Sequence, residues 1–369
     1  MQSHGEPATA PPPPQSARGL AHSKSCRTYA GLSKMTITVL MSVRNGLPFV
    51  ADAVRSVLAQ SLGEFEFLIL DDASMDGTRD FLRTLDDRRV RVIEVAENIG
   101  LTAALNVGLR EAKGEFIARQ DADDVSHPRR IELQLAFLKA NAKCAVVGSQ
   151  ARLVDARGRS LGKKNFPLAH AGIRLAHLFD NALAHSAVMF RRAAVDGYDE
   201  TFSASQDYEL WSRLGERHEL ANLPQRLVTL RVVAGGITQT HRRPELIRRV
   251  QAAHFERLTG KAASDADLDL IALFRTRVVP ERLREFRALL EEVAAECGDG
   301  SADFHRTLAL IHERIGYNLL TLSRRAGLGE IARAMKAWPP AILSVPWWRV
   351  AGLCMFGDNA RRVWGRVVR

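Results

Sequence analysis

The sequence has few cysteines, and their spacing excludes two kinds of site. Only Cys26, Cys144, Cys297 and Cys354 occur among 369 residues. They form neither a CxxC metal motif nor a set of closely spaced cysteines that could build a disulfide framework. This low cysteine content favours a reducing compartment.

Long apolar runs are also missing. No stretch of 18 or more apolar residues occurs, so we predict no transmembrane helix. An apolar segment behind a basic start is absent too, and we therefore predict no secretory signal. We expect a cytoplasmic location, with contact at the inner face of the cytoplasmic membrane considered below. The segment nearest to a membrane span, residues 337–357, is interrupted by Pro339, Pro340, Pro346 and Arg349.

Glycine-rich phosphate loops are the third absence, since neither GxxxxGK[ST] nor GxGxxG is found. The chain is 46% hydrophobic and 25% charged, enough for one large domain plus an appendage. Its formal charge of +10 allows anionic partners such as sugar nucleotides, lipid headgroups or nucleic acid. Residues 1–34 contain Pro11 to Pro14 and almost no branched apolar residues, so we predict a disordered leader.

From residue 36 onward, apolar strand patterns alternate with helical ones. This alternation predicts an α/β domain with a mostly parallel sheet, whose ligands bind at the carboxyl ends of the strands. After Gln150 we expect a hairpin at 152–161, a helix at 170–179, strands at 185–191 and 227–233, and a loop leading into a helix at 199–214. The earlier strands are predicted at 36–43, 65–70, 90–95, 116–121 and 144–149, with helices near 48–58 and at 101–112 and 128–141. Gly114 is predicted to end the helix before it as a left-handed residue.

The stretch GEFIARQDADDVSHPRR, residues 114–130, ends an apolar strand in Asp121, Asp123 and Asp124. Carboxylates this close repel one another unless a cation lies between them. Oxygen ligands that leave room for a substrate phosphate suit Mg²⁺ or Mn²⁺. The alternative is a solvated acidic loop. Because residues 42–45 and 71–72 also follow apolar strands, a ligand site at this edge is favoured.

Six segments, taken in order, resemble a family 2 glycosyltransferase of the GT-A fold, of the kind that builds bacterial cell-surface glycans. The resemblance covers residues 36 to about 240. Any single segment would be weak, whereas six in the family's order are a specific signal. They are ITVLMSVRNG, FLILDDASMDGT, NIGLTAALNVGL, GEFIARQDADD followed by HPRR, HSAVMFRR and SQDYELWSRL.

The resemblance implies a role for each matching residue. Ser42 and Arg44 would contact the nucleotide, and Asp72, with Asp71, would contact its nucleobase. Asp121 would lie near the ribose and Asp123 would bind the metal. Asp207 would act as the catalytic base. Two positions depart from the family: Gln206 stands where members commonly have an acid, and Gln120 replaces Met or Leu. An acid at the start of a helix can also serve only the helix dipole, which is the alternative for Asp207.

Two histidines have open roles. His185 either lines the acceptor pocket or only satisfies a strand end. His241 lies where some GT-A enzymes supply a metal-binding histidine, although a lone histidine often has no such role.

We therefore predict a metal-dependent inverting glycosyltransferase with Mn²⁺ or Mg²⁺ as cofactor. The donor is a nucleotide sugar, with a UDP-sugar preferred, and the acceptor is a glycan or a lipid-linked glycan. A sugar-nucleotide nucleotidyltransferase is the nearest alternative enzyme, but it would be expected to open with a glycine-rich loop. A binding protein without turnover is the other alternative. No nucleic-acid-binding module is recognised, so no nucleic-acid partner is expected.

The domains are predicted as a leader (1–34), a GT-A domain (35–243) and a helical extension (244–369). The end of the extension differs in composition, because residues 324–369 carry nine Lys or Arg against Glu330 and Asp358. Tryptophan beside arginine is typical of a segment in an anionic membrane interface, and a helical cap with an aromatic core is the alternative. Four of the five tryptophans lie there: Trp338, Trp347, Trp348 and Trp364.

Overall fold

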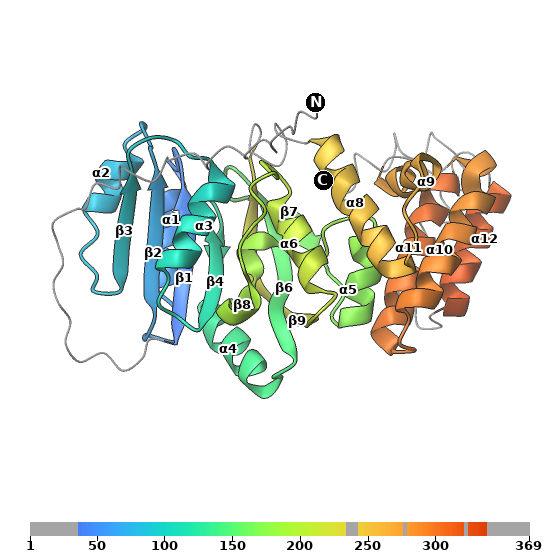
Figure 1. Cartoon of the computed structure of the whole chain (residues 1–369), viewed down its shortest axis with the longest axis horizontal. Coiled ribbons are helices and arrows are strands. Elements are labelled where there is room, and N and C mark those ends of the chain that lie inside the picture. Colours follow the sequence, from blue (N-terminus) through green and yellow to red (C-terminus); the bar gives the residue numbers. More distant parts are fainter. Residues whose placement is uncertain (1–35, 234–242, 276–278, 321–323, 338–369) are drawn as a thin grey trace, which may run out of the picture.

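A computed structural model of the chain describes residues 36–233, 243–275, 279–320 and 324–337 (Figure 1). The expected leader, His241 and the tryptophans of the C-terminal end lie outside these described residues, and the predictions made for them stay predictions.

The described strands form one sheet. They are β1 (Ile37–Val43), β2 (Glu66–Asp72), β3 (Val90–Val95), β4 (Phe116–Asp121), β5 (Val125–Ser126), β6 (Cys144–Asp155), β7 (Ser160–Lys164), β8 (Met189–Arg191) and β9 (Glu219–Val232). Their order is β3-β2-β1-β4-β8-β6-β9-β5, with β7 paired to β6. The first four run parallel, β8 is antiparallel to both of its neighbours, and β6 and β9 are again parallel. The predicted α/β fold is confirmed. Its sheet is mixed, because β8 lies antiparallel between two parallel parts and β5 and β7 also pair antiparallel with their neighbours.

Helices cover both faces of this sheet (Figure 1). They are α1 (Val50–Leu58), α2 (Thr78–Arg83), α3 (Leu101–Glu111), α4 (Arg130–Ala140), α5 (His170–His177) and α6 (Gln206–Leu214). Since alternate strand residues point to opposite faces, Val39 and Met41 of β1 pack with α1 and α4, whereas Leu40 packs with α3 and α6. Because β1 is buried on both faces, its sequence is a nearly continuous apolar run rather than an alternation of apolar and polar residues.

Gly114 has a different role from the one predicted. Helix α3 ends in an extended residue, Ala112, and Gly114 is not among the residues with positive φ. A Cβ at Gly114 would lie only 2.3 Å from the backbone nitrogen of Thr38. The prediction of a left-handed cap is therefore wrong, because glycine is needed here for the close approach of the chain to β1.

The part of the sheet after β4 also corrects the sequence prediction. Strands β6 and β9 are longer than the predicted strands 144–149 and 227–233, and their pairing shifts register around Gln150. His185–Ala187 form a 3₁₀ turn, η1, rather than a strand, and β8 begins only at Met189. The turn is preferred because the Ala187 N–H donates to the Ala184 carbonyl, which satisfies the backbone locally.

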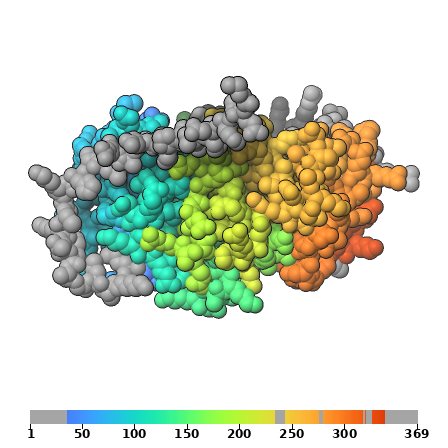
Figure 2. Space-filling view, viewed as in Figure 1, coloured from blue at the N-terminus to red at the C-terminus, as the bar shows by residue number. Residues whose placement is uncertain are grey.

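In the described part of the chain, five α-helices follow the sheet and pack against it and against one another. They are α8 (Pro244–Thr259), α9 (Asp265–Arg275), α10 (Leu283–Cys297), α11 (Ala302–Leu320) and α12 (Arg324–Ala337). Leu246 and Val250 of α8 share an apolar cluster with Tyr208 of α6, and a larger cluster joins α5 to α9, α10 and α11. In the space-filling view, the surface of the sheet region passes directly into that of these helices (Figure 2). Within the described residues, none of the helices combines the length and the apolar character needed to cross a bilayer.

Candidate active site

Strand register brings the predicted nucleotide-side residues to one edge of the sheet. Ser42 of β1 pairs with Asp121 of β4, and Val43 pairs with Asp71 of β2. The strands are parallel, so their carboxyl ends meet at this edge. Ser42 is buried, whereas Arg44, in the loop that follows, is exposed and therefore accessible to a ligand.

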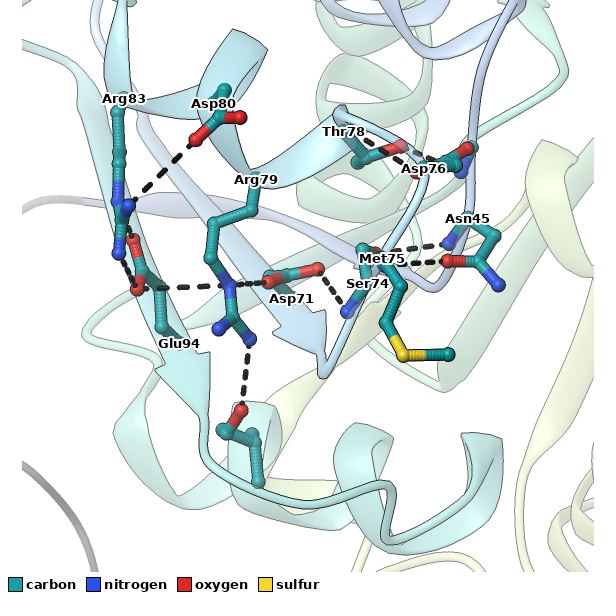
Figure 3. Close-up of polar contacts among 12 residues, drawn as sticks. Asn45, Asp71, Ser74, Met75, Asp76, Thr78, Arg79, Asp80, Arg83 and Glu94 are labelled. Atoms are coloured by element: carbon teal, nitrogen blue, oxygen red, sulfur yellow. Dashed lines mark hydrogen bonds and ion pairs between the residues drawn. The ribbon is translucent and has the colours of Figure 1, made fainter.

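The loops after β1 and β2 are joined by reciprocal hydrogen bonds (Figure 3). The Asn45 N–H donates to Ser74 Oγ at 2.9 Å, and the Met75 N–H donates back to Asn45 Oδ1 at 2.8 Å. The Gly46 N–H donates to Thr78 Oγ1 at 2.8 Å. The two loops therefore form one structural unit rather than two independent mobile segments.

Asp71 and Asp72 both make bonds within the protein. Asp71 accepts from Arg79 Nε at 2.6 Å and from the Ser74 N–H at 3.2 Å (Figure 3). Asp72 accepts the backbone N–H groups of residues 99 and 100 at 2.8 and 3.0 Å. Both side chains are almost fully buried. The structure thus places them where they hold loops together, and contact with a nucleotide base stays a prediction.

The acidic turn that follows β4 holds three carboxylates in different surroundings. Asp121 accepts from Arg119 at 2.5 Å, and Asp124 accepts the Arg231 backbone N–H at 2.8 Å. Burial, together with repulsion by Asp121, raises the pKa of Asp123 to about 6. Burial and the two neighbouring acids raise the pKa of Asp124 well above its ordinary value. The turn is therefore electrostatically crowded, as the sequence predicts.

Two fully buried arginines lie behind this turn. Arg119 donates to the Leu40 and Gln120 carbonyls as well as to Asp121, and Arg130 donates to the Arg119 carbonyl at 2.9 Å. Burial and the nearby Arg119 lower the pKa of Arg130 to about 10. Gln120, which departs from the family pattern, donates to the backbone carbonyls of Asp121 and Asp124. Two cations and one amide thus fix the shape of the acidic turn.

Arg231, near the end of β9, is a further residue that the sequence did not single out. Its Nε donates to the Asp123 carbonyl at 3.0 Å, and its guanidinium stacks on the ring of Phe49 at 4.5 Å. The same side chain reaches Asp52 of α1 at 3.7 Å. It therefore ties the acidic turn to both β9 and α1.

Asp207 lies in the first turn of α6, as predicted. Asn181 Nδ2 donates to Asp207 Oδ2 at 2.7 Å. Burial, together with the negative charge of Asp121, raises the pKa of Asp207 to about 6, although hydrogen bonds from the Tyr208 backbone and from Asn181 act against the rise. Gln206 is buried next to it and adds no charge. The structure thus brings Asp207 within electrostatic range of the acidic turn.

His185 is enclosed between aromatic rings. Its Nε2 lies 2.9 Å from the Tyr198 hydroxyl, and its ring lies 6.2 Å from that of Trp211. Burial and the nearby Arg119 lower the pKa of His185 to about 3, so the imidazole is neutral at physiological pH. A role on the acceptor side stays a prediction.

Backbone strain is found in the same loops. In the described chain, the residues other than glycine with positive φ are Asn45, Ala73 and Ser205, at 52°, 55° and 61°. The first follows Arg44, the second follows Asp72, and the third comes two residues before Asp207. Such conformations are costly for residues with a Cβ, and they often persist where function requires them.

Comparison with known proteins identifies the family to which this arrangement belongs. The family model described as Glycosyl transferase family 2 matches residues 38–198. The O-antigen biosynthesis glycosyltransferase WbnJ of Escherichia coli is 31% identical over 186 residues, which cover 48% of this chain and 71% of WbnJ. The chain belongs to glycosyl transferase family 2.

Two further similarities extend beyond the matched domain of this family 2 glycosyltransferase. An uncharacterized glycosyltransferase of Haemophilus influenzae is 25% identical over 75% of this chain and 89% of its own. That share is more than residues 1–243 could supply, so the match includes part of the C-terminal helices. The S. aureus TarS 1-349 structure in complex with UDP-GlcNAc has a TM-score of 0.53 at 16% identity, covering 84% of this chain and 92% of that one. The likeness supports the predicted GT-A fold.

Each residue that the sequence missed has at least one bonded partner that is distant in the chain. Arg119 and Arg130 occur in the stretch read as an acidic turn, yet arginine is normally exposed, so burial could not be inferred. Asn181 had no motif of its own. A charged residue inside the apolar strand pattern 227–233 was the only available signal for Arg231.

Proposed function

We propose that this family 2 glycosyltransferase transfers a sugar from a nucleotide sugar to an acceptor hydroxyl with inversion at the anomeric carbon. The observation that carries the proposal is the placement of Asp207, which Asn181 holds in the first turn of α6 within electrostatic range of Asp121. Burial there, together with the charge of Asp121, raises the pKa of Asp207 to about 6. A carboxylate with such a pKa is ionised at neutral pH and still basic enough to accept a proton in the transition state. Asp207 would take the proton of the acceptor hydroxyl as its oxygen attacks the anomeric carbon in line.

The donor side is proposed at the carboxyl ends of β1, β2 and β4. Ser42 and Arg44 would contact the nucleotide, Asp72 and Asp71 would lie on the side of the base, and Asp121 near the ribose. A UDP-sugar is the first donor to test, because the TarS structure that shares the fold is in complex with UDP-GlcNAc.

The acidic turn fits a divalent cation shared with the donor. Among the described residues, no cluster supplies three or more protein ligands for a metal. Mg²⁺, however, is commonly held by one or two carboxylates together with substrate phosphates. Asp121 and Asp124 are bonded to Arg119 and Arg231, so Asp123 is the carboxylate left to bind the cation. Mn²⁺ or Mg²⁺ bound there would stabilise the negative charge of the departing diphosphate.

A donor-hydrolysis screen tests the proposal. UDP-, GDP- and dTDP-sugars are offered to the full chain with Mn²⁺ or Mg²⁺, and release of the nucleotide is measured. We expect release from one nucleotide class, and only with a divalent cation. A thermal-shift measurement with UDP plus Mn²⁺, with oligonucleotides as the comparison ligand, distinguishes donor binding from nucleic-acid binding. Full release in excess EDTA would contradict metal dependence.

The biological setting is proposed to be cell-surface glycan synthesis in the cytoplasm, at the inner face of the membrane. The role of WbnJ in O-antigen biosynthesis supports it. A lipid-linked acceptor would then be met at the membrane surface. The basic, tryptophan-rich end of the sequence supports peripheral contact with anionic lipid.

Liposome co-sedimentation tests this contact. The full chain and a chain ending at Ala337 are compared with and without anionic lipid at low salt. We expect only the full chain to pellet with anionic vesicles. If both chains pelleted equally, membrane contact would belong to a surface other than the end of the chain. If neither pelleted, the proposed membrane contact would be wrong.

A further inference from the structure

Helix α5 is held at its N-terminus by a side chain from the C-terminal helices. The first backbone N–H groups of a helix have no partner inside the helix. Here the N–H groups of Leu168 and Ala169, which lead into α5, donate to the carboxylate of Asp303 in α11 at distances between 2.7 and 3.1 Å. The N-terminus of α5 is therefore held by a carboxylate that lies more than a hundred residues away in the chain.

The carbonyls at the other end of α5 are bound in the same way. The Tyr208 hydroxyl of α6 donates to the His177 carbonyl. Gln251 of α8 donates from Nε2 to the Leu178 and Phe179 carbonyls at 3.2 and 3.4 Å. His254 of α8 places Nε2 2.8 Å from the Arg174 carbonyl. Thus α6 and α8 satisfy carbonyls that a helix end leaves unpaired.

Apolar packing fixes the same segment. Phe179 lies 4.7 Å from the ring of Phe274 in α9 and 5.9 Å from that of Phe286 in α10. Leu175 and Leu178 belong to the same buried cluster. The segment is therefore anchored to the C-terminal helices by packing as well as by hydrogen bonds.

The chain that leaves α5 leads directly to Asp207. Asn181 donates from Nδ2 to Asp207 Oδ2 at 2.7 Å, and its Oδ1 accepts the Leu183 N–H at 3.2 Å. Because one side of the amide accepts and the other donates, its orientation is defined. The bond fixes Oδ2 of Asp207, and with it the plane of the carboxylate that would accept the proton.

We propose that Asn181 is a positioning residue for the carboxylate of Asp207, and that the C-terminal helices set its place through α5. The proposal rests on the proposed function, since it takes Asp207 as the general base. It adds that the helices after residue 243 take part in the reaction by fixing the geometry of the base.

Removing the amide tests the first half of the proposal. In Asn181→Ala, kcat should fall about tenfold to a hundredfold, because a small misplacement of a reacting group can cost that much. The amide stabilises the ionised form of Asp207, so its loss should move the acid limb of the kcat profile to higher pH. Asn181→Asp should move that limb further, since it places a second carboxylate against the first. The other titratable groups that face Asp207, Asp121 and Tyr198, are unchanged in both variants.

Stabilisation by UDP plus Mn²⁺ provides the second readout and should be unaffected by Asn181→Ala. Asn165→Ala is the matched control, because that exposed asparagine bonds only Arg226 in the described chain. A lower melting temperature with an unchanged kcat and pH profile would overturn the proposal, leaving Asn181 as a structural residue.

The second half is tested in the C-terminal helices. Asp303→Ala and Gln251→Ala should each lower kcat severalfold with UDP binding retained, and Asp303→Ala should have a smaller effect in the Asn181→Ala background than alone. Arg248→Ala is the control on α8, since among the described residues Arg248 bonds the exposed Asp265 and Asp269 and no residue of α5. Additive losses would overturn the link through α5.

The proposed function and this inference fail in different ways. If Asp207→Asn keeps most of its turnover, Asp207 is not the base and the proposed function is wrong. If Asp207→Asn is inactive while Asn181→Ala matches the wild type in kcat and pH profile, only the inference is wrong.

Discussion

The acidic turn and the start of α6 both present carboxylates to the same site, but they are stabilised in opposite ways. Arg119 and Arg130 lie fully buried behind the turn, and Arg231 bonds it from β9. Among the described residues, the groups that hydrogen-bond Asp207 are the Asn181 amide and backbone N–H groups, with no cation among them. Cations therefore lie next to the charge of the acidic turn, whereas Asp207 is bonded by neutral donors.

The same pKa of about 6 therefore has different meanings at Asp123 and Asp207. At Asp123, burial and the repulsion of Asp121 cause the rise, and a bound cation would remove the repulsion. At Asp207, burial is the largest cause and would persist when substrates bind. The difference assigns the cation to one region and proton transfer to the other, and four predictions test that division.

The largest effect is expected from Asp123→Ala. Transfer should fall to background, because the carboxylate proposed to hold the cation is lost, while the fold should stay intact since one of three crowded acids has been removed. Turnover and Mn²⁺-dependent stabilisation by UDP are the measurements. Asp86→Ala, an exposed acid between α2 and β3, is the control that should behave as wild type.

Asp207→Asn is expected to lower turnover by about two to four orders of magnitude, the usual contribution of general base catalysis. The amide keeps the size of the side chain but cannot take a proton. Binding of UDP plus Mn²⁺ should survive, in contrast to Asp123→Ala. Turnover above about a tenth of wild type would favour the helix-dipole role for Asp207.

Arg119→Met should destabilise the fold by about 3–5 kcal/mol, because it leaves two buried backbone carbonyls and the partly buried Asp121 without their cationic donor. The free energy of unfolding is measured by denaturant titration. Arg55→Met removes the exposed pair with Asp52 and should cost less than about 1 kcal/mol. Equal costs would mean that the buried cation does not support the turn.

The smallest expected effect concerns pH. Asp207 must be unprotonated to act as the base, so kcat should fall about tenfold per unit as the pH drops below about 6. The raised pKa also means that the ionised form costs stability in the fold, so Asp207→Asn should be more stable than wild type at pH 7.5. That difference should shrink as the pH falls through 6, since protonation removes the cost in the wild type. A constant difference would contradict the assignment.

Much of the donor side could be predicted from the sequence because its information is local. Apolar runs ending in polar residues located β1, β2 and β4, and parallel pairing then required Ser42, Asp71 and Asp121 to share an edge. A polar loop leading into a helix was predicted at 199–214 with Asp207 near the start of the helix, and α6 does begin at Gln206.

The rest depended on distant contacts. No periodicity indicates that Arg119 is fully buried, that Asn181 meets Asp207, or that Asp72 bonds the loop before α3. The strand expected at His185 was wrong because its backbone was satisfied by a local turn. Gly114 was assigned to a helix cap because the sequence does not show why a glycine is needed. Glycine can be required for a left-handed backbone or, as here, because a Cβ would collide with a neighbouring strand.

The capping of α5 by Asp303 bears on how chimeric enzymes of this family can be made. Exchanging the segment after residue 243 between relatives would be a natural way to seek new acceptor specificity. In this chain such an exchange would also replace Asp303, Gln251 and His254. A hybrid that keeps these three side chains together with α5 retains the contacts that position its proposed base. A hybrid joined at residue 243 would combine α5 from one protein with C-terminal helices from another, and these contacts would be lost.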